Sequence, residues 1–407
     1  MYLTADYKEV INMGKYNFDA IVDRRGTSCL KYDFAMKRKG RDDLLPMWVA
    51  DMDFPLPEEI LNVFHNRISH GIFGYSDPTD PYYAALNKWF STHYGYTIEP
   101  EWISVPCGVV FALATAVKAF TEPGDACIIQ QPVYYPFREV IENSDRKLVN
   151  SQLRYENGRY TMNYEDFEQK VVENNVKLYI LCNPHNPVGR VWTKDELVRI
   201  ADICLKHGVT MLVDEVHADF IYPGHKFTSF MTLDEKYREK LIVCTSPSKT
   251  FNVAGLQPAS IIMPNPEVKA KFETEKAAAG YSNAPIMSLL ATTTCYEMGS
   301  DWVAELVAYI TENKNYFKKF VEENFPKAYF VEPEGTYLIW VDFSAYGYSD
   351  EELEHIMLEE AHLWLDSGKI FGPATAQFER FNIACPRSTI ETALNQLKEA
   401  LDNHKKW

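Results

Sequence analysis

Short apolar runs alternate with segments of helical period along much of the chain. The runs Cys127–Gln130, Leu178–Cys182, Thr210–Val213 and Leu241–Thr245 have the length of strands and contain few polar residues. Apolar strands that alternate with helices are typical of an α/β core with a parallel sheet. Ligands bind beyond the carboxyl ends of the strands in such sheets, so the residues after these runs are the first candidates for function.

The clearest helix signal lies between two of these strands. Thr193 and Glu196 have the spacing of a capping box, apolar residues on one face follow them, and Gly208 marks the end of the helix. A second apolar run of helical length covers residues 111–120, directly after Cys107-Gly108-Val109. Both helices fit the connections of a parallel sheet.

The last hundred residues differ in pattern from the middle of the chain. Helices are predicted there at about 301–324, 349–360 and 388–401, and a strand at 337–343. We therefore expect a large domain at residues 56–300. Residues 1–55 and 301–407 are expected to form a smaller domain.

Composition and charge narrow the classes of protein. The 407 residues are 46% hydrophobic and 24% charged, which suits a globular chain and excludes intrinsic disorder. The formal net charge is −16, from 41 basic and 57 acidic residues. This charge argues against nucleic acid or an anionic membrane as a partner, although a local basic pocket for a small anion is compatible with it.

The eight cysteines are scattered, with no C-x-x-C pair. We expect small buried thiols in a reducing compartment rather than a zinc site or a disulfide framework. Residues 1–15 carry no signal segment, and no apolar stretch is long enough to cross a bilayer. The sequence therefore favours a cytoplasmic protein.

Lys249 follows the run Leu241–Thr245 in the sequence Ser246-Pro-Ser248-Lys249. An ammonium group at the partly buried end of a strand loses hydration, which lowers its pKa. A lysine of lowered pKa suits covalent chemistry with an aldehyde, and the two serine hydroxyls suit a phosphate. The alternative is a surface lysine in a Ser/Pro turn.

Acidic residues follow another of the apolar runs. Asp214 comes directly after the run Thr210–Val213, and an aspartate there suits a buried cation such as a protonated ring nitrogen. Asp214, His217 and Asp219 also have the chemistry of metal ligands. Their spacing matches none of the usual zinc or calcium patterns, so no metal is expected.

Two further segments carry candidate ligand groups. The turn Cys182-Asn183-Pro184-His185-Asn186-Pro187 contains two Asn-Pro steps, which fix a rigid turn and aim amide groups. Gly108 opens a helix, so the N–H groups of Gly108 and Val109 lie at the positive end of its dipole. This segment fits neither the Walker A pattern nor the dinucleotide-binding fingerprint.

The order and spacing of Asn186, Asp214 and Lys249 resemble the fold-type I pyridoxal-phosphate enzymes of the class I/II aminotransferase superfamily. A narrower resemblance, to the cystathionine β-lyase (cysteine–sulfur lyase) subgroup, lies in the segments Trp48–Phe54, Phe73–Tyr75, Pro132–Phe137, Pro184–Arg190, Asp214–His217 and Arg380–Ala384. The resemblance implies an α/β fold in which the large domain has a mostly parallel seven-stranded sheet and the smaller domain is α+β. It also implies pyridoxal 5'-phosphate as the cofactor.

The resemblance assigns roles to the residues around the cofactor ring. Lys249 would bind the cofactor covalently and remove the α-hydrogen of the substrate, Asp214 would keep the ring nitrogen protonated, and Asn186 would donate to the phenolic oxygen. His217 stands where many relatives have a tyrosine that shares this last role; the alternative is a packing histidine. Tyr134 would stack on the ring, the alternative being a core aromatic. Tyr135 would assist proton transfer or contact the lysine.

The phosphate and the substrate carboxylate have their own implied partners. The phosphate would be held by Gly108, Val109, Ser246, Ser248 and, from a second subunit, Tyr75, which implies a homodimer with composite active sites. Arg380 would bind the substrate α-carboxylate, since a planar guanidinium matches that group, and Arg387 is the competing candidate. Many aminotransferases carry an arginine eight residues after the lysine, where this chain has Gln257. The lyase subgroup shares that departure.

The function expected from the resemblance is β-elimination of L-cystathionine or related L-cysteine thioethers. The products would be a thiol (homocysteine from cystathionine), pyruvate and ammonia. One alternative is an aminotransferase that uses the same cofactor site. Another is a regulatory protein-binding role with incidental lyase activity.

Overall fold

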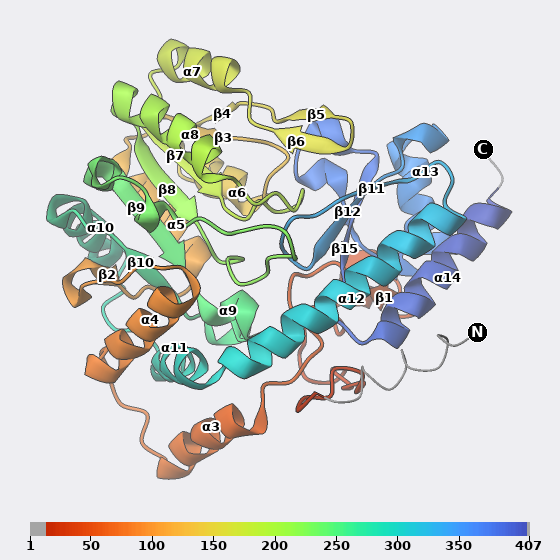
Figure 1. Cartoon of the computed structure of the whole chain (residues 1–407), viewed down its shortest axis with the longest axis horizontal. Coiled ribbons are helices and arrows are strands. Elements are labelled where there is room, and N and C mark those ends of the chain that lie inside the picture. The colour runs from red at the N-terminus through yellow and green to blue at the C-terminus, as the bar shows by residue number, and fades with distance from the viewer. Residues whose placement is uncertain (1–13, 405–407) are drawn as a thin grey trace, which may run out of the picture.

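The computed structural model describes residues 14–404 and is built around a seven-stranded sheet (Figure 1). In spatial order its strands are β2 (Ile103–Ser104), β10 (Ser260–Ile262), β9 (Leu241–Thr245), β8 (Thr210–Asp214), β7 (Leu178–Cys182), β3 (Ala126–Ile129) and β4 (Lys147–Asn150). The strands from β9 to β4 are parallel, whereas β10 is antiparallel to both of its neighbours. The predicted α/β class and mostly parallel seven-stranded sheet are confirmed.

Both faces of this sheet are buried, which explains why its central strands read as continuous apolar runs. Neighbouring side chains point to opposite faces: Leu181 packs in one hydrophobic cluster with Leu197, and Ile180 packs in another with Leu113. The cluster of Leu181 includes residues of α7 (Tyr164–Glu173) and α8 (Lys194–His207), and that of Ile180 includes residues of α5 (Val109–Phe120), α6 (Pro136–Glu142) and α10 (Pro266–Ala278).

The caps of α8 are those the sequence predicts. Thr193 accepts a hydrogen bond from the backbone of Glu196, the Glu196 side chain accepts from the backbone of Thr193, and Gly208 ends the helix at φ 70°. Helices outside this layered core are α2 (Ala35–Lys39), α3 (Glu58–His70), α4 (Asp80–His93), α9 (Pro247–Thr250) and α11 (Ile286–Met298). A small hairpin joins β5 (Arg154–Glu156) to β6 (Arg159–Thr161).

A second, four-stranded antiparallel sheet lies in the C-terminal part of the chain. Its order is β11 (Tyr329–Val331), β12 (Leu338–Asp342), β15 (Phe378–Asn382) and β14 (Asp366–Ser367). Helices α12 (Ser300–Asn324), α13 (Asp350–His355) and α14 (Arg387–Asn403) belong to the same region, and α13 continues as a π-helical turn, Ile356–Glu360. Figure 1 shows α12 and α14 side by side.

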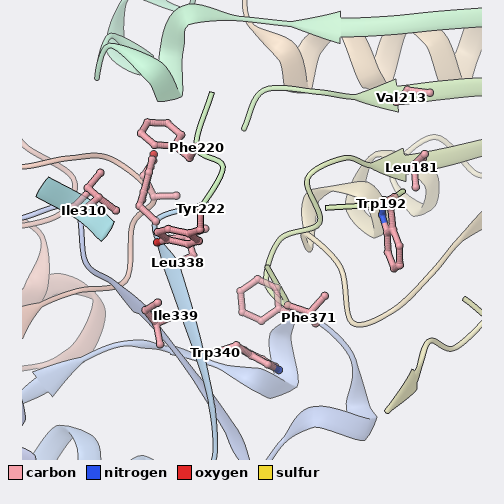
Figure 2. Packing of buried hydrophobic residues seen from close by; sticks show 14 of the residues in the cluster. Leu181, Trp192, Val213, Phe220, Tyr222, Ile310, Leu338, Ile339, Trp340 and Phe371 are labelled. Atoms are coloured by element: carbon pink, nitrogen blue, oxygen red, sulfur yellow. The ribbon is translucent and has the colours of Figure 1, made fainter. Parts of the chain in front are cut away.

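The N-terminal segment joins this C-terminal region. Strand β1 (Leu45–Pro46) pairs in parallel with β13 (Leu363–Trp364), more than three hundred residues later in the chain. Figure 2 shows the packing of buried residues that surrounds β12: Phe220 and Tyr222 lie near Leu338, and Phe371 lies edge-on to Trp340 at 5.5 Å between ring centroids. We retain as a proposal the division into domains at residues 56–300 and 1–55 plus 301–407.

Across residues 14–404, no helix combines the length and the apolar character needed to span a membrane. Within the same residues, no group of three or more His, Cys, Asp and Glu side chains is placed to hold a metal ion. The expectation about a signal segment concerns residues 1–15, and residues 1–13 lie outside the described part of the chain.

Candidate active site

A cavity of about 300 Å³ lies at the carboxyl ends of β7, β8 and β9. The predicted residues in its lining are Gly108, Val109, Tyr134, Asn186, Asp214, His217, Ser248 and Lys249. They come from separate loops that meet at one edge of the sheet, where ligands bind in open parallel sheets. The cavity thus brings together most of the residues that the sequence selects.

Lys249 lies in α9, the single helical turn that follows β9. Its Nζ donates a hydrogen bond to the carbonyl oxygen of Ala50 at 2.8 Å. Burial, together with the nearby Arg380 cation, lowers the pKa of Lys249 to about 8, against the opposing charges of Asp51 and Asp214. A substantial fraction of the amine is therefore neutral near neutral pH, which suits a nucleophile or a general base.

Asp214 is the last residue of β8 and is almost completely buried. Its Oδ1 accepts a hydrogen bond from the backbone N–H of Val216 at 3.2 Å. Burial raises the pKa of Asp214 to about 7, and the partial compensation comes from that N–H and from the charge of Lys249. A buried carboxyl in this state gains from a cationic hydrogen-bond donor placed in the cavity.

The side chain of His217 is buried in the wall of the cavity. Its Nδ1 has no hydrogen-bond partner among residues 14–404, and its ring packs edge-on against Tyr337 at 5.7 Å between centroids. Burial holds the pKa of His217 well below its usual range, with help from the charges of Lys249 and Arg380, so the imidazole is neutral. A neutral imidazole with a free nitrogen can donate to, or accept from, a ligand in the cavity.

Arg380, on β15 of the second sheet, does not itself line the cavity but contacts Asn186 in its wall. It donates from Nη1 to Asn186 Oδ1 at 3.0 Å and from Nη2 to the Trp48 carbonyl at 2.7 Å, and it forms an ion pair with Asp366. Its Nε is buried without a hydrogen-bond partner in the described chain. Arg387, the competing candidate, also lies outside the lining, and its Nε donates to Asn313 at 2.8 Å rather than to a residue of the cavity wall.

The predicted phosphate-binding groups divide into two sets. Gly108 adopts φ 81° as the N-cap of α5, and it lines the cavity together with Val109 and Ser248. Ser246 does not line the cavity: its hydroxyl donates to the Pro258 carbonyl at 2.6 Å and accepts from the backbone N–H of Ser248 at 3.0 Å. The one hydroxyl proton of Ser246 is thus already used in shaping the turn.

Two tyrosines lie outside the cavity. Tyr75 is 96% exposed, so any part it takes in a site requires a second copy of the chain. Tyr135 lines a neighbouring cavity, with its ring centroid 5.5 Å from that of Tyr134. Of Tyr134 and Tyr135, only Tyr134 lines the same cavity as Lys249.

Several residues of the site carry no clear signal in the sequence. Ala50 contributes only a backbone carbonyl, which any residue type supplies. Asp366 lies opposite Arg380 in the β14–β15 pairing, a neighbour relation that exists only in the folded sheet. Gln257 also lines the cavity and accepts a hydrogen bond from the thiol of Cys107 at 3.1 Å. The sequence shows that this position is neutral, but it does not indicate the contact with Cys107.

The donors and acceptors of the cavity fit pyridoxal 5'-phosphate. Lys249 offers an amine of lowered pKa for the aldehyde, and Asp214 offers a buried carboxyl for the ring nitrogen. The unpartnered Nδ1 of His217 and the N–H groups at the start of α5 remain for the oxygen atoms of the cofactor. The fold and these side chains define the fold-type I class of pyridoxal-phosphate proteins.

Comparison with known proteins gives the family. The profile described as "Aminotransferase class I and II" matches residues 43–397, and the chain belongs to this family. Cystathionine β-lyase PatB of Bacillus subtilis (strain 168) is 41% identical over 385 residues, which cover 95% of this chain and all of the relative. The predicted superfamily and its cystathionine β-lyase subgroup are thereby confirmed.

Solved structures agree with this assignment. Cystalysin from Treponema denticola, which contains a pyridoxal 5'-phosphate cofactor, matches with a TM-score of 0.93 at 36% identity, over 96% of this chain and 100% of that one. A PLP-bound putative aminotransferase from Clostridium difficile 630 matches with a TM-score of 0.92 at 41% identity, over 95% and 100% of the two chains.

Proposed function

We propose that this protein is a pyridoxal-phosphate-dependent β-lyase that cleaves L-cystathionine or similar L-cysteine thioethers to a thiol, pyruvate and ammonia. The observation that carries the proposal is the placement of Lys249 and Asp214 in one cavity, with a lowered and a raised pKa respectively. The similarity to relatives named cystathionine β-lyase, over almost the whole chain, supports the choice of reaction.

Each side chain has a defined task in this reaction. Bound pyridoxal phosphate supplies an electron sink for the carbanion formed at the substrate α-carbon. The neutral amine of Lys249 takes the α-proton, and Arg380 orients the substrate through its carboxylate. Asp214 holds the proton on the ring nitrogen, and Asn186 orients the ring. The carbon–sulfur bond then breaks with its electron pair on sulfur, and water completes the balance by converting the remaining three-carbon fragment to pyruvate and ammonia.

The test is release of pyruvate from L-cystathionine by the purified protein, with pyridoxal phosphate present and no 2-oxo acid. We expect continuous pyruvate formation with a matching amount of free thiol. Absence of pyruvate under these conditions would contradict the proposal.

An aminotransferase is the second candidate, because the matched family and one similar structure carry that description. Both reactions begin with removal of the same α-proton. They differ in the fate of the carbanion, which is reprotonated in transamination and expels a thiolate in elimination. Turnover that requires a stoichiometric 2-oxo acid would favour the aminotransferase.

We also propose a homodimer in which each site is completed by Tyr75 of the partner chain. The support is the exposure of Tyr75, together with that of Ile72 (66%) and Phe73 (55%) in the same segment. Large apolar side chains exposed together mark an interaction surface. A cytoplasmic location is proposed as well, because all eight cysteines are free thiols.

A further inference from the structure

A second cavity, of about 530 Å³, lies beside the first. Tyr135, Trp48 and Asp366 line it, and Arg380, which lines neither cavity, bonds to residues in the walls of both. This guanidinium contacts Asn186 in the wall of the first cavity, and Asp366 and the Trp48 carbonyl in the wall of the second. A substrate whose carboxylate binds Arg380 is therefore placed next to the second cavity.

Glu379 lies in the wall of this second cavity and is only 3% exposed. Within the described chain its side chain has neither a hydrogen bond nor an ion pair. The nearby Lys39 and Lys369 both pair with Glu354 instead, at 3.2 and 3.3 Å. Burial raises the pKa of Glu379 well above its usual range, Asp366 and Glu354 raise it further, and the charges of Lys39 and Lys369 oppose this shift only in part. Such a carboxyl gains strongly from an ammonium ligand.

Two arginines lie in the same wall, and one of them, Arg38, has no ion pair among residues 14–404. The guanidinium of Arg38 lies over the Trp48 ring at 5.4 Å from its centroid and has no ion pair. For Arg138 the nearest carboxylate is that of Glu142, 3.7 Å from its Nε, and this Nε has no hydrogen-bond partner. An unpaired guanidinium and a second one held only by a long ion pair suit a carboxylate ligand.

Another part of the wall is aromatic. Trp48 and Trp364 are stacked with 4.3 Å between ring centroids and both line the cavity. This surface suits methylene groups and a thioether sulfur, since aromatic rings bind both. The cavity therefore offers an apolar wall, an anionic group and cationic groups together.

We propose that the second cavity binds the far end of the substrate and selects thioethers that carry an α-amino acid at both ends. The far ammonium binds Glu379, the far carboxylate binds Arg138 and Arg38, and the chain between the two ends lies along Trp48 and Trp364. This inference rests on the proposed β-lyase function. It predicts discrimination between L-cystathionine and S-alkyl-L-cysteines, which have no far amino acid.

The test compares kcat/KM for L-cystathionine and S-ethyl-L-cysteine in the holoenzyme and its variants. For Glu379→Gln and Arg138→Gln we expect kcat/KM for L-cystathionine to fall about tenfold through KM, the size expected for one lost charge-assisted hydrogen bond. Turnover of S-ethyl-L-cysteine is expected to stay within about twofold, since it makes no contact with these residues. The control variant Arg199→Gln, whose exposed side chain pairs with Glu165, is expected to change neither.

Each other outcome overturns the inference. An equal loss with both substrates gives these residues a structural role, and no loss with either removes them from recognition. Arg138→Gln alters a partly exposed side chain, so it carries the test if Glu379→Gln does not fold. A wild-type protein that cleaves S-ethyl-L-cysteine but not L-cystathionine contradicts only the second cavity's role. A protein that releases pyruvate from neither contradicts the proposed function, and the inference with it.

Discussion

At the scale of single residues, the site depends on ionisable groups whose loss of hydration on burial is not fully offset by hydrogen bonds or opposite charges. Asp214, His217 and Lys249 all have pKa values displaced mainly by burial, Asp214 upward and the other two downward. In each case burial disfavours the charged form of the side chain. A ligand that supplies hydrogen bonds or an opposite charge to these groups therefore binds favourably. Perturbation of this kind in one cavity is typical of functional groups rather than of packing.

Replacing Lys249 tests its role directly. Lys249→Ala is expected to abolish pyruvate release, because it removes the group that takes the α-proton. The melting temperature should change little, since the lysine makes one hydrogen bond, to the Ala50 carbonyl. Lys226→Ala, at an exposed position, is the matched control and should keep full activity. Unchanged turnover in Lys249→Ala would contradict the mechanism.

The lowered pKa of Lys249 predicts how the apoprotein reacts with pyridoxal 5'-phosphate as pH changes. Only the neutral amine attacks the aldehyde, so the rate should rise about tenfold per pH unit below the pKa and level off above about 8. An ordinary lysine would continue to gain reactivity up to pH about 10.4. The measurement is the rate of cofactor absorbance change from pH 6 to 10.

A variant of Arg380 checks the cause of that shift. Arg380→Gln removes a cation that lowers the pKa of Lys249, so the midpoint should move to higher pH. Arg387→Gln should leave it in place, because Arg387 bonds to Asn313 and does not line the cavity. A rate that climbs steadily to pH 10 in the wild-type protein would refute the lowered pKa.

The sequence predicts the site residues that directly follow strands. It does not predict those whose contribution is a backbone carbonyl or a contact with a distant segment. Lys249, Asp214 and Asn186 are visible because each stands directly after an apolar strand or in a distinctive turn. The hydrogen bond from the Ser246 hydroxyl to the Pro258 carbonyl and the ion pair of Asp366 with Arg380 join segments that are separate in the sequence. No local spacing encodes them, so the sequence alone did not predict them.

At the scale of elements, the segment Trp48–Asp53 joins the two sheets at the site. Its Ala50 carbonyl accepts from both Lys249 and Tyr337, and its Trp48 carbonyl accepts from Arg380. The side chains of Asn252 and Asn382 bind other backbone groups of the same segment. The position of Lys249 and Arg380 is thus coupled to one short piece of extended chain.

A buried ionic cluster anchors this segment, and its loss should destabilise the protein. Asp53 accepts from Arg24 at 2.7 Å, Lys31 at 2.9 Å and Tyr32 at 3.1 Å, and Lys31 is only 1% exposed. Asp53→Asn leaves the Lys31 ammonium buried without its closest carboxylate, which costs about 3 kcal/mol. We expect a clearly lower melting temperature by calorimetry.

The control for this prediction is an exposed ion pair. Asp402→Asn breaks the pair with Lys398, whose side chains are 59% and 40% exposed respectively, and should change the melting temperature very little. Equal changes in melting temperature for Asp53→Asn and Asp402→Asn would show that the buried cluster stabilises the protein no more than an exposed ion pair does.

Long, regular elements were predicted well, and short ones were not. Helix α8 and the strands β7, β8 and β9 follow from capping residues and apolar runs, and the predicted helix at 301–324 appears as Ser300–Asn324. The predicted helix at 349–360 is instead α13 followed by a π-helical turn. Strands β1 and β13 are two residues long and exist only through pairing with each other, so no local period reveals them.

At the scale of the whole molecule, the proposed composite site allows a test by mixing subunits. Tyr75→Ala and Lys249→Ala should each lose activity as homodimers. A mixed dimer contains one site with an intact Lys249 and, from the other subunit, an intact Tyr75. Mixing and refolding the two variants should therefore restore pyruvate release, whereas activity no greater than that of the parents would contradict the composite site.

The contacts of residues 48–53 with Arg380 and Asn382 have a consequence for how the enzyme is synthesised. Residues 48–53 leave the ribosome more than three hundred residues before their partners Arg380 and Asn382. The N-terminal part of a chain emerges and begins to fold first. These contacts therefore form only after residues 380–382 have been synthesised, and a chain terminated before them lacks Arg380, the proposed partner of the substrate carboxylate.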